Sequence, residues 1–162
     1  MSLSRAITIA FLALLWVAAA PAPAASMPYS DGADARSDVK QALAEAHASG
    51  RPVLLIFGAN WCEDCRALDA SLQSPRNAAL MAREFEVVKI DVGRFDRNLD
   101  VDRAYGDPIA KGIPAAVVVS PDNRVLYATR AGELADARRM SETGVHDFFV
   151  RAVERARVGA SR

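Results

Sequence analysis

The segment PVLLIFGANWCEDCRALDASL, residues 52–72, joins an uninterrupted apolar run to a Cys-x-x-Cys pair. The apolar run at 52–57 is typical of a strand that is covered on both faces. A helix is predicted from about Cys62 to Leu72, with Cys62 at its N-terminus and Cys65 one turn inside. These are the only two cysteines of the chain. The segment therefore predicts a strand–turn–helix unit that presents a pair of thiols.

Two thiols at this spacing and position are suited to disulfide exchange. The unpaired N–H groups and the dipole at a helix N-terminus favour a thiolate at Cys62. Cys62 would attack a substrate disulfide, and Cys65 would then resolve the mixed disulfide. A structural disulfide is one alternative, although so small a ring removes little chain entropy. A zinc site is another, but it needs about four ligands and only His47 and His146 would remain to complete it.

The first 25 residues differ in composition from the rest of the chain. Arg5 precedes an uncharged apolar run at 6–20, and small residues follow at 21–25. This is the pattern of a secretory signal peptide, because the run is shorter than the roughly 20 residues that span a bilayer. An uncleaved anchor helix is the alternative. We therefore predict a mature protein in a bacterial periplasm, where disulfides persist.

The remaining composition is that of one globular domain. The chain has 162 residues, of which 51% are hydrophobic and 25% are charged. After a flexible leader at 26–36, a single domain is predicted over 37–162. Lys and Arg together number 20, as do Asp and Glu, so no nucleic acid or anionic membrane is indicated as a partner. We expect a monomer.

Hydrophobic periodicity and turn signals predict the remaining elements. The expected elements are a helix at 38–49 capped by Ser37 and ended by Gly50, strands at 52–57 and 85–92, a helix from 62 to 72 with a continuation from Pro75 to about 85, a short helix at 98–105, strands at 114–120 and 124–129, and a last helix capped by Ser141. The early alternation of helices and strands indicates a parallel pair, and the late hairpin adds an antiparallel edge. The expected fold class is α/β, with a mixed sheet of about four to five strands and helices on both faces.

Two motifs resemble the thioredoxin family. FGANWCEDC, residues 57–65, resembles the family's approach to its active site. KGIPAAVVV, residues 111–119, resembles the family's Ile–cis-Pro segment that leads into a strand. The resemblance covers about residues 37–157 and implies a thioredoxin-like fold with a redox-active Cys62–Cys65 disulfide, and no other cofactor or metal.

The resemblance also implies substrate-binding residues. The Ile113–Pro114 peptide bond would be cis and face the thiols, and its backbone would pair with an extended substrate strand. Gly132 matches a glycine that lets the substrate backbone approach. Trp61 would pack beside the thiols and shield the mixed disulfide, or else it would simply fill the core.

The sequence departs from the family at several positions. Ile56 stands where many thioredoxins carry a buried acid, so water, Glu63 or Asp64 would have to deprotonate Cys65. Gly58 replaces an aromatic residue that is common in thioredoxins. The segments at 92–113 and 130–141 are longer than in a minimal thioredoxin, and they form either a partner-specific rim or tolerated insertions.

The two acids between the thiols are expected to tune the thiol pKa. Glu63 and Asp64 oppose a thiolate at Cys62, which nearly cancels the effect of the helix N-terminus. A strong oxidant needs a stabilised reduced form, so we predict a reductant or isomerase rather than an oxidant. The expected substrates are protein disulfides, and the resemblance implies a membrane-embedded thiol reductase as electron donor. The alternative is a non-catalytic thioredoxin-fold binding module, acting as a redox-linked chaperone or a metallochaperone.

Overall fold

A computed structural model describes residues 27–160, so the predicted signal peptide at 1–25 lies outside the described residues. The elements are α1 (Ala35–Ser49), β1 (Val53–Gly58), α2 (Glu63–Leu72), α3 (Pro75–Glu84), β2 (Glu86–Asp91), α4 (Leu99–Ala104), the 3₁₀ helix η1 (Pro108–Lys111), β3 (Ala115–Val119), β4 (Val125–Ala128), the 3₁₀ helix η2 (Ala137–Arg139) and α5 (Glu142–Ala160). Within the described range, no helix has the length and apolar character needed to cross a bilayer.

The strands form one mixed sheet in the order β2–β1–β3–β4. β1 is parallel to β2 and antiparallel to β3, and β3 is antiparallel to β4. Phe57 of β1 pairs with Ile90 on one side and with Ala115 on the other. The C-terminal end of β1 therefore lies beside the first residue of β3, which brings the Cys-x-x-Cys segment next to the segment that contains Pro114. The predicted mixed sheet is confirmed, with four strands.

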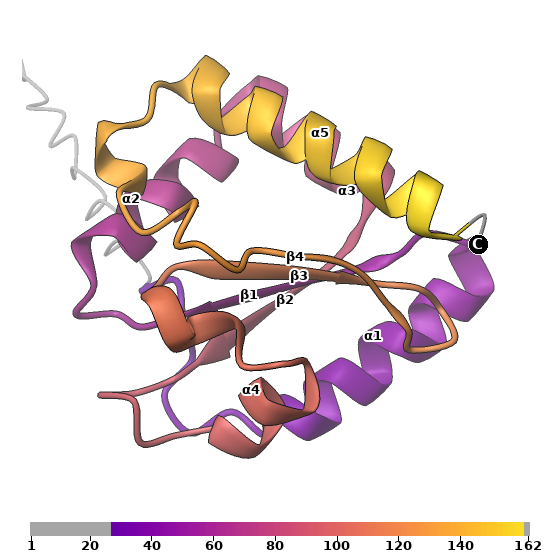
Figure 1. Cartoon of the computed structure of the whole chain (residues 1–162), viewed down its shortest axis with the longest axis horizontal. Coiled ribbons are helices and arrows are strands. Elements are labelled where there is room, and N and C mark those ends of the chain that lie inside the picture. The colour runs from indigo at the N-terminus through magenta and orange to yellow at the C-terminus, as the bar shows by residue number, and fades with distance from the viewer. Residues whose placement is uncertain (1–26, 161–162) are drawn as a thin grey trace, which may run out of the picture.

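Helices cover both faces of this sheet (Figure 1). Leu55 and Phe57 point into a cluster that includes buried residues of α1 and α4. Leu54 and Ile56 point to the opposite face, where α2, α3 and α5 supply the packing residues. β1 is buried along its whole length, as expected for a strand between two helical layers. This rigid strand fixes the position from which α2 starts.

The N-terminal part of the described chain differs from the prediction. α1 begins at Ala35 rather than at residue 38, because the Asp34 carboxylate accepts hydrogen bonds from the N–H groups of Arg36 and Ser37. Ser37 is therefore inside the helix and is not its cap. Tyr29, within the predicted flexible leader, is 3% exposed and belongs to the core. The 3₁₀ helices η1 and η2, which were not predicted, lie in the two long segments.

Candidate active site at the start of helix α2

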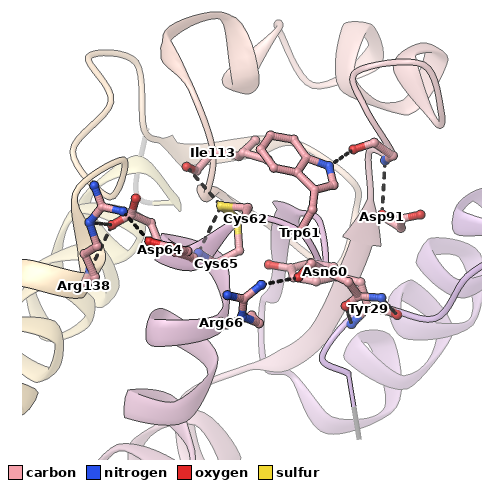
Figure 2. The surroundings of a disulfide bond; sticks show 12 residues. Tyr29, Asn60, Trp61, Cys62, Asp64, Cys65, Arg66, Asp91, Ile113 and Arg138 are labelled. Carbon is pink, nitrogen blue, oxygen red and sulfur yellow. Dashed lines mark hydrogen bonds and ion pairs between the residues drawn. A yellow bond between two sulfur atoms is a disulfide. The ribbon is translucent and has the colours of Figure 1, made fainter.

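The two cysteines form a disulfide at the N-terminus of α2 (Figure 2). Cys62 is the N-cap residue, and its Sγ accepts a hydrogen bond from the backbone N–H of Cys65 at 3.1 Å. Cys62 is 6% exposed, whereas Cys65 is fully buried. A hydrogen bond from a backbone N–H favours the thiolate form of a sulfur atom. Cys62 is thus the more accessible of the two cysteines, and the Cys65 N–H would stabilise a thiolate at its sulfur.

The segment before Pro114 faces this sulfur. The Ile113–Pro114 peptide bond is cis, as the resemblance implied. The Ile113 carbonyl oxygen lies 3.7 Å from Cys62 Sγ. Gly132 has a φ of +75°, and a Cβ there would lie 2.9 Å from the carbonyl oxygen of Lys111. Gly132 therefore permits the close approach of the chain's own backbone, and its role toward a substrate remains a prediction.

A groove of about 450 Å³ opens over the disulfide. The residues that line it are Trp61, Cys62, Glu63, Asp64, Phe95, Gly112, Ile113, Ala135 and Arg138. Trp61 is 47% exposed, so it does not fill the core. Its indole N–H donates to the Gly93 carbonyl at 2.6 Å, and its ring meets Phe95 edge to face. One wall of the groove is therefore aromatic and held in place by the segment after β2.

The opposite wall is charged. Arg138 of η2 donates to the Glu63 carboxylate at 2.7 Å, and the Arg138 backbone N–H donates to Asp64 Oδ1 at 3.0 Å. Figure 2 shows the Arg138 side chain directed at Asp64, on the far side of the disulfide from Trp61. Glu63 and Asp64 were expected to act on Cys62 with no nearby cation, and the structure corrects this expectation. Arg138 offsets part of their charge, and residue spacing gave no sign of it.

A buried carboxylate lies on α2, one turn beyond Cys65, and not on β1. Ile56 is buried and pairs in register with Lys89 of β2. The Lys89 ammonium forms an ion pair with Asp69 of α2, one turn beyond Cys65. Asp69 is 8% exposed and also accepts from the Gln73 side chain at 2.6 Å. The acid that the family carries on the strand is thus absent, while α2 supplies a different one to the same layer.

Tyr29 is a further residue of the site that the sequence analysis missed. Its backbone N–H donates to Asn60 Oδ1 at 3.0 Å, and Asn60 Nδ2 donates back to the Tyr29 carbonyl at 2.7 Å. Asn60 immediately precedes Trp61, so this pair joins the N-terminal segment to the approach to the thiols. The side chain of Tyr29 reaches the place beside Gly58 and Cys65. The one sign of this in the sequence was Gly58, a glycine at a position where thioredoxins commonly have an aromatic residue.

Comparisons with known proteins agree with this geometry. The family model described as thioredoxin-like matches residues 34–121. A crystal structure of a disulphide isomerase from Xylella fastidiosa Temecula1 is 58% identical, covers 80% of this chain and 98% of its own, and has a TM-score of 0.78. A thioredoxin from Thermus thermophilus has a TM-score of 0.51 at 21% identity, covering 74% of this chain and 83% of its own, and so shares the fold. No curated protein matches the chain.

Proposed function

This chain belongs to the thioredoxin-like family, and from that premise we propose that it is a thiol–disulfide oxidoreductase acting on protein disulfides outside the cytoplasm. The observation that carries the proposal is the position of the Cys62 sulfur. It caps α2, accepts the Cys65 N–H, and faces the groove beside Ile113. The similarity to a protein described as a disulphide isomerase supports the same chemistry.

The reaction balances with this chain's own sulfur atoms. The Cys62 thiolate attacks one sulfur of a substrate disulfide, and the other substrate sulfur leaves as a thiolate. The Cys65 thiolate then attacks Cys62 Sγ and releases the second substrate sulfur. The substrate gains two electrons, and the chain ends with the Cys62–Cys65 disulfide. The full burial of Cys65 suits it to attack within the complex rather than to meet a substrate first.

We further propose that the protein works on the reducing or isomerising side. A strong oxidant owes its potential to a well-stabilised reduced form. Arg138 brings one positive charge against the two negative charges of Glu63 and Asp64, so the net charge of this wall still opposes a thiolate at Cys62. Continued reduction outside the cytoplasm needs an electron source, for which a membrane-embedded thiol reductase is the proposed partner.

Insulin reduction by dithiothreitol tests the exchange chemistry. We expect the protein to accelerate the reaction and Cys62→Ser to abolish the acceleration. Cys65→Ala should accumulate a mixed disulfide through Cys62. Equilibration with glutathione buffers tests the direction, and we expect a potential closer to the roughly −270 mV of thioredoxins than to the roughly −120 mV of a strong oxidant. A non-catalytic binding module would leave insulin turnover at the background rate.

A further inference from the structure

Tyr29 lies beside Gly58 and Cys65, and it is not among the residues that line the groove. A Cβ placed on Gly58 would overlap the hydroxyl oxygen and Cζ of Tyr29, and it would lie 3.0 Å from Cys65 Sγ. The hydroxyl oxygen and the sulfur thus flank the same vacant Cβ position. Tyr29 is 3% exposed, and Cys65 is fully buried. The two distances from this Cβ position place the hydroxyl oxygen no more than about 5 Å from the resolving sulfur, within two nearly buried residues.

Two features of the sequence hold Tyr29 in that position. Gly58 lacks the side chain that would otherwise occupy the space. Asn60 fixes the Tyr29 backbone through two hydrogen bonds of 3.0 and 2.7 Å. The N-terminal segment thereby places an aromatic ring beside Cys65, where Gly58 at the end of β1 has no side chain.

We propose that the Tyr29 hydroxyl donates a hydrogen bond to Cys65 Sγ in the reduced protein, and that this bond stabilises the thiolate that resolves the mixed disulfide. The inference rests on the proposed function, since a resolving thiolate is needed only for exchange. In the oxidised state, none of the hydrogen bonds found among residues 27–160 joins the Tyr29 hydroxyl to Cys65 Sγ. A disulfide sulfur is a weak acceptor, whereas a thiolate is a strong one, so reduction creates the partner for this donor.

The surroundings keep the hydroxyl in its donor form. Burial, together with the negative charges of Asp69 and Asp91, raises the pKa of Tyr29 well above its usual range. Asp69 is paired with Lys89 of β2, and Asp91 is paired with Arg97 at 2.9 Å. Tyr29 therefore stays protonated at neutral pH. Because it keeps its own proton, it stabilises the thiolate by hydrogen bonding and does not act as its base.

The test is the pKa of Cys65 in a Cys62→Ser background, where one thiol titrates without coupling to a second. The probe is the ¹³Cβ shift of labelled cysteine as a function of pH. Tyr29→Phe keeps the ring and removes only the hydroxyl. We expect it to raise the pKa of Cys65 by about one unit, which is a tenfold smaller thiolate fraction at pH 7. Tyr105→Phe removes a different buried hydroxyl, one bonded to Asn123, and should leave this pKa unchanged.

A second readout uses the active protein. In the otherwise unmodified chain, Tyr29→Phe should slow the resolution of a preformed mixed disulfide about threefold at pH 7, because the higher nucleophilicity of a more basic thiolate partly offsets its smaller fraction. At high pH the rate should reach or exceed the wild-type value. A Cys65 pKa that is the same with and without the Tyr29→Phe substitution would overturn the proposal. The titration needs no substrate, so failure to reduce insulin would count against the proposed function without deciding the role of Tyr29.

Discussion

Replacing Arg138 by alanine should raise the pKa of Cys62. The substitution removes the cation that pairs with Glu63 but keeps the backbone hydrogen bond from residue 138 to Asp64. The charge of both acids is therefore uncovered, while Asp64 keeps its backbone partner. For a cation about 7 Å from the thiolate and an effective dielectric constant of about 40–80, Coulomb's law gives about 0.6–1.2 kcal/mol. This corresponds to an increase of about half to one unit in the pKa of Cys62.

The rate of alkylation of the reduced protein by iodoacetamide, followed against pH at low salt, measures this pKa. Arg139→Ala is the matched control, because Arg139 is more exposed and pairs with Asp136 at 3.6 Å. Because Arg138 is half exposed, the difference should shrink in 1 M salt, where the Debye length is about 3 Å. An Arg138→Ala protein with an unchanged or lower Cys62 pKa at low salt would refute the electrostatic account of this wall of the groove.

Three further predictions concern stability. Gly58→Ala should lower the free energy of unfolding in urea by about 1–3 kcal/mol, because the new methyl displaces Tyr29, and most of this loss should disappear in a Tyr29→Ala background. Asp69→Asn should cost about 1–3 kcal/mol, since it leaves the partly buried Lys89 without its counter-ion; an Asp69→Asn protein as stable as wild type would show that the pair contributes nothing net. Hydrogen bonds from Arg51 and then Ser49 lower the pKa of Glu86, so its contribution to stability is present at neutral pH and is lost as the pH falls below about 4.5, its usual value. Glu86→Gln should therefore flatten the acid limb of a stability–pH curve, and an identical limb would contradict this assignment.

The sequence was informative where structure is set by neighbours along the chain. The apolar run before the thiols predicts β1, and Pro75 correctly marks the first residue of α3. The position of Cys62 at a helix N-terminus also follows from local pattern alone. Each of these features depends on periodicity, capping or turn chemistry within a few residues.

The parts that sequence could not supply are contacts between distant segments. Arg138 reaches Glu63 across 75 positions, and nothing in the spacing of either residue indicates the partner. Tyr29 is buried beside Gly58 of β1 and Cys65 of α2, and these two residues come together with it only in the folded protein. A short polar stretch with one aromatic residue has no period, so it was interpreted as a leader. Tertiary packing, rather than local propensity, decided its structure.

The packing of Tyr29 beside Gly58 and Cys65 affects how fragments of this protein should be prepared. The family match starts at residue 34, which makes that residue a natural place to truncate an expression fragment. Such a fragment would retain β1–β4 and both sulfurs, but it would leave a void where the Tyr29 ring packs. A reduction potential measured on this fragment would be that of a site without Tyr29, and not that of the longer protein. Alignments confined to the matched region would likewise leave out the aromatic partner of Gly58.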